Sequence, residues 1–340
     1  MAASQTPMHI SDAADLYDPS IQKMFVKSAK KFAANFKKYY SVETGVEDYV
    51  RKDSSLSGLG EADFIDPENA AITQESPIQG FDQTYTQLEV GKVLSFTKRM
   101  WKFGIKKRDM TKIVDELRSA CMRKRERYCA ERLDNGWSST YTHTDGRGNK
   151  SITLTGGDSV VFYSKAHTRE DGGTDWNNRV FDGTTYDMDA DYDALKAMLR
   201  TAALIADPKG NIMEDLNMDT IIVRKGSTPY FKFSEILGAI KKGWKPVSAD
   251  HDGSGVPEFK LVELPRLTNT EYWHATDSSK IGEGQYEFGL QYLESQGIEL
   301  EGPNVVFKTG EIQYKSTLMF SVGHNDSRSW IGSRGTNVLT

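Results

Sequence analysis

The stretch FDQTYTQLEVGKVLSF, at residues 81–96, carries most of the information about the fold. Aromatic and β-branched residues partly alternate with polar ones along it, which is the pattern of a half-solvated β-strand. A basic helix is predicted to follow over residues 106–133, and at 1.5 Å per residue it would be about 42 Å long. A helix of this length exceeds what one ordinary domain core requires. We therefore expect this helix to support an elongated part of the molecule.

The strand at residues 81–96 needs a partner, and the sequence before it offers one. Residues 62–75 are expected to be the outgoing strand of a hairpin, with the turn at residues 77–80. A hairpin that projects from a domain has too little local core to be stable alone. Its apolar face is therefore expected to be buried against a neighbouring molecule, and the chain is predicted to assemble.

Composition places the chain among globular proteins, with 340 residues, 38% hydrophobic and 11% aromatic. Apolar runs such as residues 221–223 are too short to cross a bilayer, and the N-terminus lacks the pattern of a signal peptide. We expect a soluble intracellular protein with no membrane association. Cys121 and Cys129 lie about 12 Å apart along one predicted helix, too far for a disulfide, and are expected to be reduced and buried.

Charge is unevenly distributed around the net value of −5. Residues 21–40 contain six lysines and no acid, and residues 106–133 contain ten basic and five acidic side chains. These basic segments would suit nucleic-acid phosphates or the acidic face of another copy. A third interpretation is an amphipathic helix whose lysines are only solvated, with Phe25, Phe32 and Phe36 on its other side.

The remaining pattern mixes helices with antiparallel strands and predicts an α+β fold. The further expected helices are residues 19–40, 192–206 and 229–240. The further expected strands are residues 138–143, 151–155, 219–223, 260–267, 271–276, 304–307 and 311–322. The Gly/Asn/Asp-rich residues 169–185 are expected to form a long surface loop.

No catalytic signature is present, so an enzyme is not expected. The six histidines are scattered, and the acidic loop at residues 250–258 lacks the spacing of a calcium site. We assign no catalytic, cofactor-binding or metal-ligating residue and no cofactor.

The order of several segments resembles tailed-bacteriophage major capsid proteins with the HK97 fold, in particular the Mu-like head proteins. The segments that carry the resemblance are residues 56–60 with 80–85, 97–104, 158–167 with 172–178, 206–210 with 219–223, and 314–333. The last one contains the finish Asp-x-Arg-x-x-x-Gly-Ser, from Asp326 to Ser333. The match spans residues 55 to 335.

The resemblance implies a division into an N-arm, an E-loop hairpin, a P-domain with a long spine helix, and an A-domain. The implied boundaries are 1–58 for the N-arm, 59–100 for the E-loop, 101–195 for the P-domain with its spine helix at about 106–133, 196–302 for the A-domain, and 303–340 for the closing P-domain strand and C-terminus. Gly58, Gly60, Gly91 and Gly104 are candidate hinges, and Lys92 and Lys98 are expected to form ion pairs.

The resemblance also implies a function. The chain would be a major capsid protein that assembles as pentamers and hexamers into an icosahedral shell around packaged double-stranded DNA. Implied partners are other copies, a separate scaffolding protein, a portal, a decoration protein, and DNA by non-specific contact. The location would be the virion, after assembly in the cytoplasm of the host bacterium. Deleting residues 1–40 is expected to leave a folded subunit that assembles poorly. The alternative is a soluble nucleic-acid-binding protein that uses the basic N-terminal segment.

Overall fold

A computed structural model of the protein describes residues 34–56, 59–60, 62, 64, 74–99, 107–241, 256–282 and 288–335. Most of the predicted N-terminal helix, most of residues 62–75, the glycines Gly58 and Gly104, and most of the acidic loop at 250–258 lie outside this range. Among the described residues, no helix is long and apolar enough to span a membrane.

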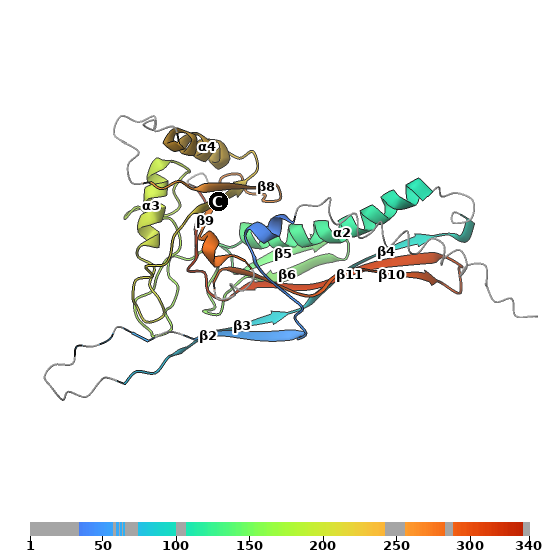
Figure 1. Ribbon diagram of the computed structural model, residues 1–340, viewed down its shortest axis with the longest axis horizontal. Helices are drawn as coiled ribbons and strands as arrows, with labels where there is room; N and C mark the ends of the chain where they lie inside the picture. Colours follow the sequence, from blue (N-terminus) through green and yellow to red (C-terminus); the bar gives the residue numbers. More distant parts are fainter. Residues whose placement is uncertain are drawn as a thin grey trace, which may run out of the picture.

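A long four-stranded sheet forms one half of the molecule, in the order β1-β10-β11-β4. Its strands are β1 (Ser41–Thr44), β10 (Leu290–Val305), β11 (Ile312–His324) and β4 (Leu88–Phe96). β1 runs parallel to β10, and the other pairs are antiparallel. The helix α2 (Lys107–Asp134) lies along this sheet (Figure 1). The expected brace of a long helix over extended strands is therefore present.

A second four-stranded sheet, in the order β12-β9-β7-β8, forms the other half. Its strands are β12 (Trp330–Ser333), β9 (Trp273–Thr276), β7 (Thr220–Arg224) and β8 (Lys260–Leu264). The helices α3 (Tyr192–Ala202) and α4 (Thr228–Lys241) lie beside it (Figure 1). The side chain of Asp191 starts α3 by accepting a hydrogen bond from the Ala194 N–H at 2.7 Å, as an N-cap residue does.

Two separate hairpins and two short 3-10 helices complete the part of the fold that the structure describes. The hairpins are β2 (Val50–Leu56) with β3 (Gln79–Thr86), and β5 (Thr140–Asp145) with β6 (Gly148–Thr153). The 3-10 helices are η2 (Asn35–Lys38) and η4 (Ser278–Lys280). The β2–β3 hairpin runs out from beneath the long sheet, away from the N-terminal half of α2 (Figure 1).

The predicted hairpin partner is wrong. Residues 81–96 do not form one strand, because the chain breaks at Gln87 into β3 and β4. β3 pairs with β2 at residues 50–56, and β4 pairs with β11 in nine consecutive positions. Alternation cannot distinguish one strand from two consecutive strands in different sheets, since the side-chain period is the same in both.

The boundaries carried over from the resemblance also cut through observed elements. The boundary at residue 302 divides β10, which pairs with β11 along its whole length in the long sheet. β12, placed by sequence with the closing strand, instead pairs with β9 in the second sheet. Gly91, a candidate hinge, lies inside the unbroken β4–β11 ladder opposite Thr317, so bending there would break sheet hydrogen bonds.

The largest hydrophobic cluster lies between α2 and the long sheet, and Tyr128 of α2 meets Phe320 of β11 in it. A second cluster fills the space between α3, α4 and the second sheet. Cys121 and Cys129 are both free and buried, as expected. Burial raises the pKa of both thiols.

The first described residues of the N-terminal segment already belong to this hydrophobic core, and their local structure differs from the predicted helix. Residues 35–38 form the 3-10 helix η2 rather than the end of a long α-helix. Phe36, Tyr39 and Tyr40 are almost completely buried in the main cluster, and the Tyr40 hydroxyl donates to the Cys129 carbonyl at 3.1 Å. The expectation that residues 1–40 can be removed without harming the fold is therefore corrected, because the cut would remove three core aromatic side chains.

Two histidines are buried in the core as neutral groups. Burial lowers the pKa of His274 to about 3. Burial, and then the nearby Arg132 and His167, hold the pKa of His324 well below its ordinary value. Both ring nitrogens of His324 lack hydrogen-bond partners, and its ring packs edge-on against Phe162 with the centroids 4.7 Å apart.

Replacing His324 by Leu should flatten the loss of stability in acid. In the unfolded chain a histidine gains a proton below about pH 6.5, whereas the buried ring stays neutral, so stability is lost as pH falls below that value at about 1.4 kcal/mol per pH unit per histidine. Urea unfolding at pH 7.0, 6.0 and 5.0 measures this slope for the two proteins. An identical slope in His324→Leu would show that His324 is protonated in the folded state.

Candidate assembly surfaces

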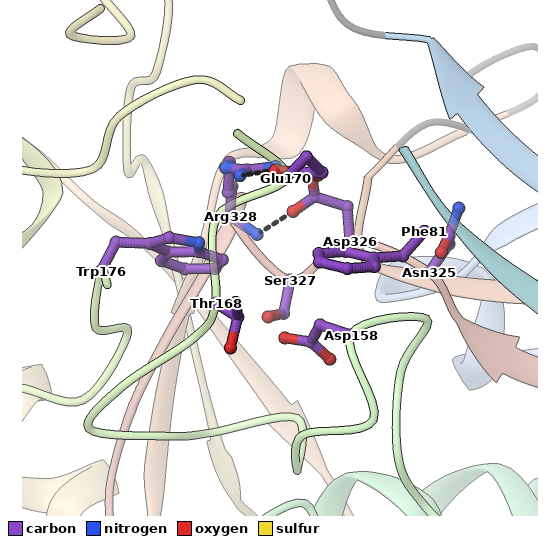
Figure 2. A pocket seen from close by; sticks show the side chains of 9 residues that line it. All are labelled: Phe81, Asp158, Thr168, Glu170, Trp176, Asn325, Asp326, Ser327 and Arg328. Atoms are coloured by element: carbon purple, nitrogen blue, oxygen red, sulfur yellow. Dashed lines mark hydrogen bonds and ion pairs between the residues drawn. The ribbon is translucent and has the colours of Figure 1, made fainter. Parts of the chain in front are cut away.

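A buried ionic cluster joins the two halves of the molecule. The guanidinium of Arg328, with 2% of the side chain exposed, donates to Glu170 at 2.9 Å, to Asp326 and to the Ala206 carbonyl at 2.9 Å. Figure 2 shows Arg328 between these two carboxylates, and its guanidinium lies 5.0 Å from the Trp176 ring. Burial raises the pKa of Asp326, and the positive charge of Arg328 opposes this rise. The cluster connects the β11–β12 link to two distant loops.

A hydrogen-bonded network adjoins this cluster. His167 contacts Asp158 at 2.7 Å through Nδ1 and stacks on Trp176 with the ring centroids 4.3 Å apart. The Asn178 amide donates to the Phe162 carbonyl at 2.7 Å and accepts from the Ser164 N–H at 2.9 Å. The expected surface loop at residues 169–185 is therefore partly wrong, since Trp176, Asn178 and the two residues after it are buried.

The space inside this cluster is too small for a substrate. The pocket drawn in Figure 2 has a volume of about 10 Å³, which is about the space that one water molecule needs. Its carboxylates Glu170 and Asp326 are engaged by Arg328, and Asp158 by His167. No group of three or more metal-ligating side chains occurs in the part of the chain that the structure describes. These residues hold the fold together, so candidate surfaces for a partner lie elsewhere.

The projecting hairpin is fixed to the body at its base. Tyr85 of β3 is buried against Gly323 of β11, where any Cβ would clash with the tyrosine ring. Phe81 lies against Gly157, where an added Cβ would come within 2.9 Å of the phenylalanine Cβ. Both positions leave no space for a side chain, because the Tyr85 ring fills the space at Gly323, and the Asn325 amide oxygen and the Cβ of Phe81 fill it at Gly157.

Apolar side chains are exposed in the hairpin and beside it. Phe64, between β2 and β3 in the sequence, is fully exposed, and at the base Val50, the first residue of β2, and the preceding Tyr49 are 51% and 70% exposed. Glu75 is paired with Lys209 and accepts a hydrogen bond from the Gly60 N–H at 2.8 Å. The Lys209 pair and the backbone bond lower the pKa of Glu75. An exposed surface pair contributes little to stability, so this contact holds the outer part of the hairpin only weakly.

Two adjoining grooves run between β4 and α2. One has a volume of about 550 Å³ and reaches the β5–β6 turn at Arg147; the other, about 300 Å³, is lined by apolar residues such as Val93 and Leu117. Lys92 lines both grooves, and the described contacts include no ion pair for Lys92, Lys98 or Arg147. The ion pairs expected for Lys92 and Lys98 are thus not observed among the described residues. β4 is also the outer strand of its sheet, and an exposed edge strand favours pairing with another chain.

A third groove, which we call the hinge groove, lies where β3 passes into β4. It has a volume of about 600 Å³ and is lined by nine residues: Gly45, Val46, Glu47, Asp48, Tyr49, Gln87, Ser295, Gln296 and Met319. Its only charged lining residues are the acids Glu47 and Asp48. No sequence signal identified this groove, because it combines four segments that are distant along the chain.

The basic helix α2 does not present a free positive stripe over its described side chains. Arg123 pairs with Glu116 at 3.0 Å, and Arg127 with Glu131 in the same helix. Lys124 pairs with Asp145 at 2.7 Å, and Arg125 approaches Glu294 at 3.6 Å. At least four of the ten basic residues counted in residues 106–133 are therefore paired within the molecule.

Comparison with solved structures identifies the architecture. The capsid structure of the cyanophage P-SCSP1u matches with a TM-score of 0.52 and 10% sequence identity, over 90% of this chain and 89% of that one. This chain has the HK97 fold of phage capsid proteins. The predicted α+β class and HK97 architecture are thus confirmed, whereas the Mu-like group stays a prediction.

Other structures similar to this HK97-fold chain come from different sources. A virus-like particle from Pyrococcus furiosus matches with a TM-score of 0.48 and 9% identity, over 93% of this chain and 98% of that one. The holo-SrpI encapsulin complex from Synechococcus elongatus matches with a TM-score of 0.45 and 12% identity, over 88% of each chain. No protein-family model and no curated protein sequence matches the chain.

The sequence motifs behind the resemblance meet in this HK97-fold structure. Asp158, His167, Asn178, Asp326 and Arg328 lie in three segments of the sequence, and the structure joins them in the buried cluster and its adjoining network. The sequence did not indicate which of them pair. The sequence analysis did not identify Gln87 as the point where β3 ends and β4 begins, because a glutamine between two alternating runs gives no local signal.

Replacing Arg328 by Ala should destabilise the HK97-fold subunit by about 3–5 kcal/mol, because two buried carboxylates lose their cation. The matched control is Arg123→Ala, which breaks an exposed pair and should cost about 0–1 kcal/mol. Chemical denaturation of both variants measures the difference. Equal effects would contradict the role given to the buried cluster.

Proposed function

We propose that this chain is the major capsid protein of a tailed bacteriophage. The observation that carries the proposal is the match to a phage capsid chain over nine-tenths of both chains. Identical subunits would form pentamers and hexamers that close into an icosahedral shell around packaged double-stranded DNA. The site of action is then the virion, with assembly in the cytoplasm of the host.

The shape of the subunit suits this role. Closed shells need heterologous contacts, in which a surface on one copy meets a different surface on the next. The β2–β3 hairpin supplies a projecting surface, and the grooves beside β4 supply a receiving surface with Lys92 and Arg147, for which the contacts among the described residues include no ion pair. The sequence between β2 and β3 contains the acids Glu61, Asp63 and Asp66, whose charge is opposite to that of Lys92 and Arg147.

We also propose how the parts named in the resemblance correspond to this chain, with their boundaries placed at the ends of the observed helices and strands. The E-loop corresponds to residues 50–86, the P-domain to the long sheet with α2 as its spine helix, and the A-domain to the second sheet with α3 and α4. The N-arm is the segment before η2. A separate scaffolding protein, a portal and a decoration protein are the further proposed partners.

The nucleic-acid-binding alternative gains no support from the described residues. Phe36 and Tyr39, two aromatic residues of the predicted N-terminal helix, are buried in the core. At least four of the six basic side chains of α2 that the structure describes form ion pairs. Contact with packaged DNA therefore remains non-specific in the proposal.

Expression of the chain, alone and with a scaffolding protein from the same phage, tests the proposal. Rings, tubes or closed shells are expected in negative-stain electron microscopy of the high-mass fraction from size exclusion. The control is the same preparation in 1 M salt, where contacts that depend on ion pairs weaken. A stable monomer under every condition would contradict a capsid role.

Two truncations separate folding from assembly. Removing residues 1–33 should leave the melting temperature within a few degrees of the full chain, because these residues precede the buried aromatics, and should reduce particle yield at least tenfold. Removing residues 1–40 should also unfold the subunit, since loss of each buried aromatic costs about 3–5 kcal/mol. Circular dichroism measures the folding and sedimentation the yield. A full particle yield from the shorter truncation would show that the arm is not needed.

A further inference from the structure

Two buried histidines each place Nδ1 against a carboxylate, and they differ in what the second ring nitrogen meets. His143 contacts Glu131 through Nδ1, and its Nε2 lies 2.5 Å from Nζ of Lys124. An ammonium group can only donate, so Nε2 of His143 accepts and this ring is neutral. His167 contacts Asp158 at 2.7 Å through Nδ1. The atoms around its Nε2 therefore decide whether His167 carries one proton or two.

The second ring nitrogen of His167 faces acceptors. The amide oxygen of Asn178 lies 3.2 Å from Nε2. The orientation of this amide is fixed, because its nitrogen donates to the Phe162 carbonyl at 2.7 Å and its oxygen accepts from the Ser164 N–H at 2.9 Å. The Ser327 hydroxyl, 3.4 Å from Nε2, can accept from the same nitrogen. A neutral ring would instead set the lone pair of one nitrogen against an acceptor oxygen.

The charges beside the ring favour the same second proton. The pocket of Figure 2 is lined by the carboxylates of Asp158, Glu170 and Asp326, and Arg328 is the only cation among the described residues of that lining. All four side chains are at most 11% exposed. One guanidinium cannot balance three buried carboxylates, and buried charges are stable only when they are paired. A charged His167 beside Asp158 supplies the second positive charge.

The remaining groups around the ring are compatible with this charge. The His167 ring stacks on Trp176 with the centroids 4.3 Å apart, and the face of an indole attracts a cation. On β11, burial and then Arg132 of α2 and His167 hold the pKa of His324 well below its ordinary value. His324 is therefore neutral and does not compete for the negative charge of Asp158.

We propose that His167 is a buried imidazolium, protonated at both ring nitrogens, and that it is the second cation of the ionic cluster joining the two halves of the subunit. Nδ1–H donates to Asp158 and Nε2–H to the Asn178 oxygen. Loss of the Nε2 proton in alkaline solution removes this charge and leaves a lone pair facing the amide. The joint between the halves is therefore a device that loosens as pH rises, and it does not depend on the capsid function.

Solid-state NMR of the sedimented full-length chain, labelled with ¹⁵N only in histidine, tests the charge at pH 8.0. Protonated and unprotonated ring nitrogens have well-separated ¹⁵N shifts, and a histidine with an ordinary pKa is neutral at this pH. One of the six histidines should nevertheless have both ring nitrogens protonated. His167→Gln should remove that signal, and the matched His143→Gln should leave it unchanged.

Each outcome decides the proposal. The absence of any doubly protonated ring in the unmodified protein overturns it, and this result needs no variant. A doubly protonated ring that persists in His167→Gln overturns the assignment to this residue. If His167→Gln does not fold, Asp158→Asn replaces it: loss of the carboxylate should convert the doubly protonated ring to the neutral form, and an unchanged signal overturns the pairing with Asp158.

The pH dependence of stability gives a second readout. The unfolded chain releases the second His167 proton above about pH 6.5, whereas the folded ring keeps it, so this stabilisation is complete below that pH and declines as pH rises. In urea titrations, the unfolding constant should rise about tenfold more between pH 7.0 and 8.0 in the unmodified protein than in His167→Gln. The buried thiols of Cys121 and Cys129 contribute equally to both proteins. An equal pH dependence in the two would show that the folded ring is neutral.

Discussion

The buried guanidinium of Arg328 sets the geometry on which the rest of the molecule depends. It lies in the short link between β11 of the long sheet and β12 of the second sheet, and it binds Glu170 and the Ala206 carbonyl from two other loops. A buried charge without partners costs several kcal/mol, so all these groups must come together at once. That requirement fixes the orientation of the second sheet and its helices relative to the long sheet.

The long sheet and α2 then act as the frame that carries the projecting hairpin. α2 packs its apolar side on β11, and its described cations are mostly paired with acids on the helix itself or on neighbouring strands. This arrangement lets a strongly basic helix lie in the body of a subunit. Lys92 and Arg147 line one groove and Glu47 and Asp48 another, and none of the four has an ion pair among the described contacts. Surfaces of opposite sign on one chain are suited to contacts between identical copies.

The hairpin base shows how close packing and incomplete packing occur side by side. Tyr85 fits against Gly323 without space for a methyl group, whereas the adjoining Gln87 is buried without a hydrogen bond. Buried polar groups are mostly paired in folded proteins, and Gln87 is one of several buried side chains in the described part of the subunit that lack a hydrogen bond. Phe64 and Tyr49, in and beside the hairpin, are left exposed.

The sequence by itself determined the elements that local periodicity encodes. The helices α2, α3 and α4, the β5–β6 hairpin and strands such as β7 and β11 are found close to their expected bounds, because caps, turns and apolar spacing act over a few residues. The ordered motifs also sufficed to indicate the HK97 fold. Only the tertiary structure decided which strands pair: β2 with β3, β4 with β11, and β1 with β10 about 250 residues away. It alone placed Arg328 between its carboxylates and Gln87 in a groove, since contacts between distant segments depend on the global packing that no local pattern records.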